Sequence, residues 1–129
     1  MPTWLWVWGP AAAQMIAIFF LSNQAKLPSL PGGLTGYTGH LIGYALLGAL
    51  MLRALVGADC RRLTPGIALA AWALSCGYGI TDEFHQSFVP GRTATFDDLV
   101  ADACGAALSI VGLVIWRRVR QPAARTRGL

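Results

Sequence analysis

Residues 4–21, WLWVWGPAAAQMIAIFFL, decide the class of fold. Gln14 is the only strongly polar side chain in this run. A helix of this length, at 1.5 Å per residue, is about 27 Å long and crosses the hydrocarbon core of a bilayer. A cleaved signal peptide is the alternative, but no Lys or Arg precedes the run and no clear small-x-small cleavage site follows it. Trp4, Trp6 and Trp8 favour an interfacial anchor, so we expect a membrane-spanning helix.

The composition of the 129-residue chain also indicates a membrane protein. Hydrophobic residues make up 55% and charged residues 12%, about half the roughly 25% of charged residues in a typical soluble domain. Intrinsic disorder is excluded because it requires low hydrophobicity. The 3 cysteines have no CxxC spacing, so they indicate neither a disulfide framework nor a zinc site. The length predicts one domain, which we place at residues 1–120, followed by a basic tail at 121–129 that we expect to be disordered.

Three further apolar runs follow the first. They cover residues 40–56, 65–81 and 98–116. Thr64 and Pro65 predict the start of a helix, with threonine as N-cap and proline at the first helical position. Pro and Gly at high density predict a loop at residues 22–39, and residues 57–64 are expected to form a tight turn. The sequence therefore predicts an all-α fold, an integral membrane bundle of four transmembrane helices.

The basic residues are distributed unevenly over the two sides of such a bundle. Four spans place both ends of the chain on one side. Eight of the 10 basic residues fall on that side: Arg53, Arg61, Arg62, Arg117, Arg118, Arg120, Arg125 and Arg127. Lys26 and Arg92 fall on the other side. The positive-inside rule then places both termini in the cytoplasm and residues 82–102 outside. The same asymmetry accounts for the net charge of +4 without a nucleic-acid partner.

Polar side chains gather at the outward ends of the predicted helices, and residues 82–102 hold five of the 6 acidic residues. Helical spacing puts three sets of residues each on one face: Asp98, Asp102, Gly105, Ser109 and Gly112; Cys76, Gly79, Glu83 and Gln86; His40 and Tyr44. We expect these faces to converge into one site under the outer leaflet. Arg92, in the loop between two of them, is expected to fold back onto Asp98 or Glu83 as their counter-charge.

Residues 78–105, YGITDEFHQSFVPGRTATFDDLVADACG, resemble the VanZ-like family, named for a teicoplanin-resistance membrane protein. The matching positions are Asp82, Glu83, Gln86, Pro90, Gly91, Arg92, Asp98, Asp102 and Gly105. His40 and Tyr44 match the family's His-x3-Tyr motif, and Ser22 matches its serine after the first span. The family's Asp-Lys pair before the histidine is replaced by Tyr-Thr at residues 37–38. The resemblance implies a multi-pass protein of the bacterial cytoplasmic membrane, with a link to glycopeptide resistance.

The predicted site comprises His40, Tyr44, Asp82, Glu83, Gln86, Arg92, Asp98 and Asp102. The first hypothesis is a cell-envelope protein that binds an anionic lipid or cell-wall-precursor group, with Arg92 holding the anion. The second is a membrane-embedded hydrolase acting on such a lipid, with Glu83 or Asp98 as general base and His40 as acid. The third is a structural or partner-binding bundle in which the polar residues join helices. The sequence leaves open the choice among them, the catalytic residues and the oligomeric state.

A metal site is a further alternative for the acidic and imidazole groups. Carboxylates favour Mg²⁺, Mn²⁺ or Ca²⁺, and the two histidines, His40 and His85, would admit Zn²⁺. No dedicated spacing such as HExxH is present, so the sequence assigns no metal ligand and no cofactor. The structural interpretation is that Asp98 and Asp102 lie near a helix start and are stabilised by the helix dipole.

Overall fold

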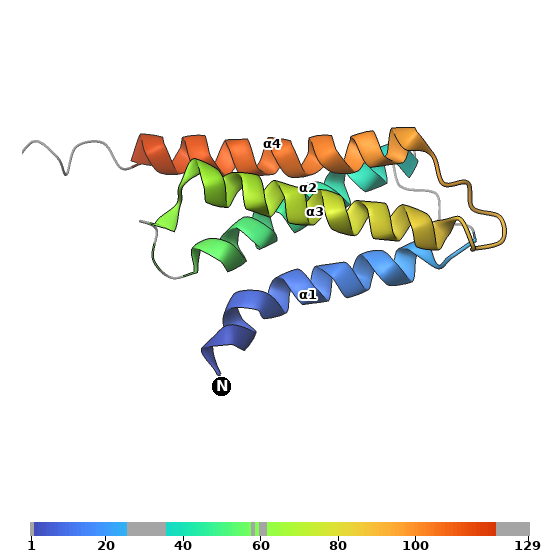
Figure 1. The fold of residues 1–129 in the computed structure, drawn as a ribbon, viewed down its shortest axis with the longest axis horizontal. Helices are drawn as coiled ribbons and strands as arrows, with labels where there is room; N and C mark the ends of the chain where they lie inside the picture. The colour runs from blue at the N-terminus through green and yellow to red at the C-terminus, as the bar shows by residue number, and fades with distance from the viewer. Residues whose placement is uncertain (1, 26–35, 58, 60–61, 121–129) are drawn as a thin grey trace, which may run out of the picture.

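The described part of the chain folds into four α-helices. The computed structural model describes residues 2–25, 36–57, 59 and 62–120. Its helices are α1 (Thr3–Ser22), α2 (Gly36–Val56), α3 (Pro65–Gln86) and α4 (Phe96–Arg120). Successive helices run in opposite directions, so the start of α1 and the end of α4 lie at the same end of the molecule (Figure 1). The all-α prediction is confirmed, whereas the predicted tail at 121–129 lies outside the described residues.

The helices extend beyond the apolar runs that predicted them. α2 begins at Gly36, inside the predicted loop 22–39, of which residues 26–35 lie outside the described part of the chain. α3 continues five residues beyond its predicted end, and Gln86 Nε2 donates to Asp82 Oδ2 (3.0 Å) one turn earlier. This bond holds the last turn of α3. Hydropathy marks the apolar part of a helix, but the backbone hydrogen bonds continue through its polar end.

Three of the four helices, α1, α2 and α4, are long and apolar enough to cross a membrane. α3 starts as predicted, because the Thr64 hydroxyl accepts a hydrogen bond from the Ile67 amide (3.2 Å). Although α3 has 22 residues, it is not among the candidate spans. Its last turns carry Asp82, Glu83 and Gln86, which lower its mean hydropathy. Length and composition therefore do not confirm the prediction of four membrane-spanning helices, because α3 does not qualify.

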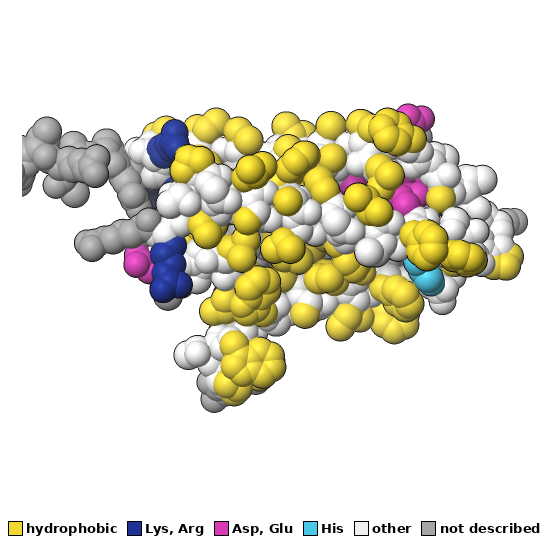
Figure 2. Space-filling view, viewed as in Figure 1, with side chains coloured by type: hydrophobic (Ala, Val, Ile, Leu, Met, Phe, Trp, Pro, Cys, Tyr) yellow, Lys and Arg dark blue, Asp and Glu magenta, His cyan; other side chains and the backbone are white. Residues whose placement is uncertain are grey.

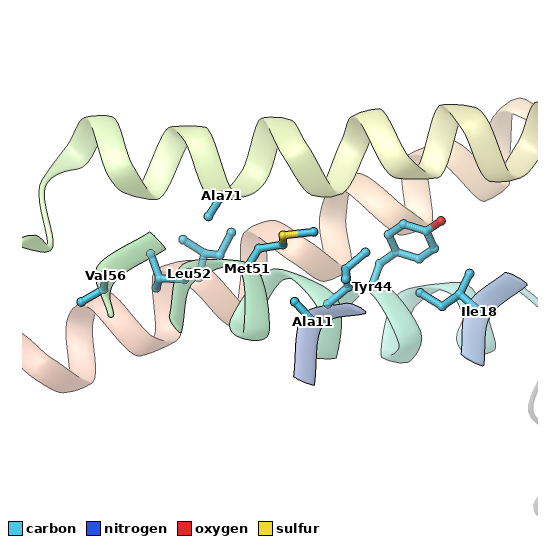
Figure 3. Close-up of a cluster of buried hydrophobic side chains, with 9 residues drawn as sticks. Ala11, Ile18, Tyr44, Met51, Leu52, Val56 and Ala71 are labelled. Carbon is cyan, nitrogen blue, oxygen red and sulfur yellow. The ribbon is translucent and has the colours of Figure 1, made fainter. Parts of the chain in front are cut away.

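α2 and α4 are in backbone contact. A Cβ at Gly48 of α2 would lie 2.8 Å from the Cα of Ala106 in α4. A Cβ at Gly105 of α4 would overlap the carbonyl oxygen of Leu41 in α2. Small residues thus let the two helices approach closely, as they do in many membrane helix pairs. The cluster of buried hydrophobic side chains, drawn in Figure 3, includes Ala11, Ile18, Tyr44, Met51, Leu52, Val56 and Ala71.

Arg53 of α2 forms hydrogen bonds with the backbone of α1. Pro10 has no N–H, so the carbonyl of Trp6, one turn earlier in α1, lacks its helical partner. Arg53 Nη1 donates to this carbonyl (2.9 Å) and to that of Val7 (3.2 Å). A residue that the sequence identifies only as a cytoplasmic charge therefore also satisfies the backbone of a neighbouring helix.

Candidate functional site

Polar residues from all four helices lie together at the end of the bundle where α1 and α3 end and α2 and α4 begin, on the right of Figure 1. Six of them are at most 6% exposed: Ser22, Tyr44, Asp82, Glu83, Gln86 and Asp102. His40 and Asp98 are half-buried. We call these eight residues the polar cluster. The convergence that the helical spacing predicts is present in the structure.

A hydrogen bond joins His40 of α2 to Asp102 of α4. His40 Nδ1 lies 2.9 Å from Asp102 Oδ1. With Asp102 ionised, Nδ1 donates this bond, and Nε2 faces Asp98 Oδ1 at 4.0 Å. Gly79 of α3 makes room for the pair, because a Cβ there would lie 2.9 Å from Asp102 Oδ2. The glycine in the predicted α3 stripe is thus required by the site.

Glu83 and Asp98 face the same histidine from α3 and α4. Glu83 Oε1 lies 3.9 Å from His40 Nδ1, and both Glu83 oxygens are buried without a hydrogen-bond partner among the described residues. The Thr95 hydroxyl donates to Asp98 Oδ2 (2.8 Å) and accepts from the Asp98 amide (3.3 Å). Thr95 is not among the predicted site residues, although the Thr-x-x-Asp spacing of a capping box identifies it. The cap positions Asp98 at the start of α4.

Asp82 and Gln86 form a second network beside His40. Gln86 Nε2 donates to Asp82 Oδ2 (3.0 Å) and to Ser22 Oγ (3.3 Å). The Tyr44 hydroxyl donates to the same Asp82 oxygen at 3.5 Å. Ser22, which is absent from the predicted site, therefore belongs to the polar cluster and links α1 to α3.

Arg92 does not pair with the carboxylates, contrary to the sequence-based expectation. Its Nη2 and Nε donate to the carbonyls of Leu21 (3.2 Å) and Ser22 (3.4 Å). These carbonyls lie at the end of α1, where the Leu21 carbonyl also accepts from the Gln24 amide (3.2 Å). The guanidinium adds a hydrogen bond to each of them, so it caps the helix. Gly91, with a φ of +83°, turns the chain just before Arg92. Within the described part of the chain, no carboxylate of the polar cluster forms an ion pair with Arg92.

His85 lies outside the polar cluster. Its ring stacks on Phe19 of α1, with the ring centroids 4.7 Å apart. Two positions along an α-helix from Glu83, it faces a different side of α3. The two-histidine site that would favour Zn²⁺ on composition alone is therefore not formed.

A family model described as VanZ/LLP1 matches residues 10–117, a range that includes Arg92 and the whole polar cluster. The chain belongs to the VanZ/LLP1 family. The resemblance carried by residues 78–105 is confirmed. No curated protein and no solved structure matches the chain. The residue roles in this VanZ/LLP1 protein are therefore argued from its own geometry.

The site of the VanZ/LLP1 protein has an acidic interior and a basic group at its edge. The ligand atoms of His40, Glu83 and Asp98 lie within 4.8 Å of one another. Ser22 connects this interior to Arg92, because its hydroxyl accepts from Gln86 and its carbonyl accepts from Arg92 Nε. Such an arrangement offers ligands to a cation on the inside and a guanidinium to an anion beside it.

Proposed function

We propose that this VanZ/LLP1 protein binds the anionic head group of a lipid or a cell-wall precursor at Arg92, beside the polar cluster. The supporting observation concerns Arg92. Its guanidinium is held by two carbonyl oxygens, which carry no charge, and no carboxylate of the polar cluster neutralises it. The planar guanidinium suits paired hydrogen bonds to a phosphate or carboxylate. A cation that is fixed in place by neutral groups is a ready binding group for an anion.

We also propose that α3 crosses the membrane with the other three helices. Large apolar side chains of α3 are 37–69% exposed: Leu69, Trp72, Leu74, Ile80 and Phe84. Its polar residues Asp82, Glu83 and Gln86 are buried against the other helices. Ionisable residues in membrane helices are tolerated when they face the interior of a bundle. Figure 2 shows apolar side chains over most of the face between the two ends.

The charges at the two ends support an orientation. Figure 2 shows Lys and Arg side chains at one end and the histidine with most acidic side chains at the other. The described basic residues at the first end are Arg53, Arg62, Arg117, Arg118 and Arg120. Lys26, Arg61, Arg125 and Arg127 lie outside the described residues. The positive-inside rule places the basic end and both termini in the cytoplasm. The polar cluster then lies at the outer face of the bacterial cytoplasmic membrane.

Cysteine labelling tests this orientation. In a cysteine-free background, Thr93→Cys is expected to react with a membrane-impermeant maleimide on intact cells. Arg62→Cys, at the opposite end, is expected to react only after lysis. Both positions are exposed, and Thr93 is preferred to Gly91 because a φ of +83° strains any residue other than glycine. The reverse labelling pattern would place the polar cluster in the cytoplasm.

Replacing Arg92 tests the binding function. The full-length protein is expected to retain phosphatidylglycerol in preference to phosphatidylcholine, as measured by native mass spectrometry. Arg92→Gln is expected to weaken this retention by about tenfold or more, because a hydrogen bond to a charged group contributes about 1.5–3 kcal/mol. In a bacterium whose teicoplanin resistance depends on the protein, the same change is expected to abolish resistance.

Arg118→Gln is the matched control, since it removes one arginine from the opposite end of the bundle. It is expected to leave both the retention of phosphatidylglycerol and the resistance unchanged. An equal loss in Arg92→Gln and Arg118→Gln would show that the lipid responds to total charge, and the proposed site would be wrong.

A hydrolase acting on the same lipid is a second candidate, favoured by the hydrogen bond between His40 and Asp102. A carboxylate that accepts from Nδ1 orients the imidazole and leaves Nε2 available for proton transfer. Turnover of a lipid substrate by the purified protein would distinguish this enzyme from a binding protein. A purely structural bundle is disfavoured, because Glu83 makes no hydrogen bond to another described residue that would join helices.

A further inference from the structure

The carboxylate of Glu83 has no hydrogen-bonding partner within the described structure. Its side chain is 7% exposed, and both of its oxygens are buried. Buried polar groups are nearly always hydrogen-bonded, and burial of a charge that accepts no hydrogen bond costs free energy. Ionisable groups at such positions in membrane proteins are retained when they have a function. Glu83 therefore indicates a partner that the described residues do not supply.

The charges around Glu83 indicate the sign of that partner. The carboxylates of Asp82, Asp98 and Asp102 belong to the same cluster. Among the described residues, His40 is the only basic side chain within 4.0 Å of any carboxylate in the cluster. Arg92 is directed instead at the end of α1. A group that binds among these four carboxylates and one imidazole is a cation.

We propose that His40, Glu83 and Asp98 bind a divalent metal ion. Their ligand atoms lie within 4.8 Å of one another. Two donors on one ion with bonds of about 2.0–2.2 Å are separated by at most about 4.4 Å, so small side-chain movements close the site. The three residues come from α2, α3 and α4, and the close packing at Gly79 and Gly105 sets the spacing of these helices.

Asp102 supports this site without binding the ion. By accepting from His40 Nδ1 at 2.9 Å, it fixes the imidazole ring and leaves Nε2 as the nitrogen ligand. Histidines that bind metals commonly donate their other N–H to a carboxylate in this way. Nε2 is also the nitrogen that faces Asp98, at 4.0 Å.

The donor set indicates the class of ion. One imidazole nitrogen with two carboxylates suits Zn²⁺ or Mn²⁺, whereas Ca²⁺ and Mg²⁺ prefer oxygen ligands. Three protein ligands leave a coordination position open. An oxygen of an anionic ligand fits that position, with Arg92 nearby. The metal site goes beyond the proposed lipid binding and stands whether or not a lipid binds.

The experiment measures metal binding by the full-length protein in detergent, without added lipid. After treatment with EDTA and gel filtration, the protein is titrated with Zn²⁺ and, separately, with Mn²⁺ in a calorimeter. We expect one ion to bind per chain. Glu83→Gln and Asp98→Asn are each expected to weaken binding by at least about tenfold. Asp98 is half-buried, so its variant provides the test if Glu83→Gln does not fold.

Two matched controls come from the same helices. Asp97→Asn removes an exposed carboxylate next to Asp98, and His85→Gln removes the histidine that stacks on Phe19. Both are expected to bind the ion as the unaltered protein does, whereas His40→Gln loses binding. Folded protein that binds neither ion would overturn the proposal, as would controls that lose as much affinity as the site variants. Lipid retention by Arg92→Gln is measured separately, so failure of one proposal is distinguishable from failure of the other.

Discussion

Replacing Gly105 with alanine is expected to separate α4 from α2 and to destabilise the whole bundle. The new Cβ would overlap the carbonyl oxygen of Leu41 and lie 3.1 Å from the amide nitrogen of Ala45. Both obstacles are backbone atoms, which cannot rotate away as a side chain does. Overpacking costs about 1–3 kcal/mol even where side chains yield, so we expect the free energy of unfolding to fall by about 3 kcal/mol or more. Thermal unfolding in detergent, followed by circular dichroism, measures the loss.

Gly112→Ala is the matched control on the same helix. Nothing lies within 4 Å of a Cβ at Gly112. Alanine is a better helix former than glycine by about 1 kcal/mol, so this variant is expected to be at least as stable as the unaltered protein. The close approach at Gly105 also holds His40 against Asp102, and Gly105→Ala is therefore expected to weaken metal binding too. Equal melting temperatures for the two variants would contradict the backbone contact.

Hydropathy predicted the four helices because each contains a long apolar run, but it did not predict where they end. The last turn of α3 is held by the bond between Gln86 and Asp82, which a hydropathy pattern does not register. The same polar turn removes α3 from the candidate spans, although its outer face carries Ile80 and Phe84, 60% and 69% exposed. Average hydropathy is thus a poor guide for a helix whose acidic residues face inward.

Helical spacing predicted which residues lie close together better than it predicted their hydrogen-bond partners. Asp98 and Asp102, and likewise His40 and Tyr44, share helix faces, and the structure brings these faces together. The partner of Arg92 was predicted wrongly, because a loop residue has no periodicity to place its side chain. Its partners are carbonyls at the end of α1, about 70 residues away in the sequence. A carbonyl at a helix end that can accept a further hydrogen bond is a property of the folded backbone and leaves no side-chain signal.

Replacing Glu83 with glutamine is expected to stabilise the metal-free protein while abolishing metal binding. The two side chains have nearly the same shape, so the substitution replaces one carboxylate oxygen with an NH₂ group and removes the charge. The charge has no hydrogen-bond partner among the described residues and lies among other carboxylates, so its removal relieves desolvation and repulsion. We expect the free energy of unfolding at alkaline pH in EDTA to rise by about 1–3 kcal/mol. With Zn²⁺ or Mn²⁺ present, we expect the unaltered protein to be the more stable of the two, because an ion stabilises only the protein that binds it.

Gln86→Met, one turn along α3, is expected to have the opposite sign. Methionine has a similar length but no N–H, so the buried Asp82 and Ser22 both lose the donor that joins them. This costs about 1–3 kcal/mol with or without the metal, because the bond is structural. A buried charge that binds a ligand lowers the stability of the ligand-free protein, as we expect for Glu83. A side chain that joins helices by hydrogen bonds raises the stability, as we expect for Gln86. If Glu83→Gln also melts below the unaltered protein in EDTA, then Glu83 is a structural residue and the metal site is wrong.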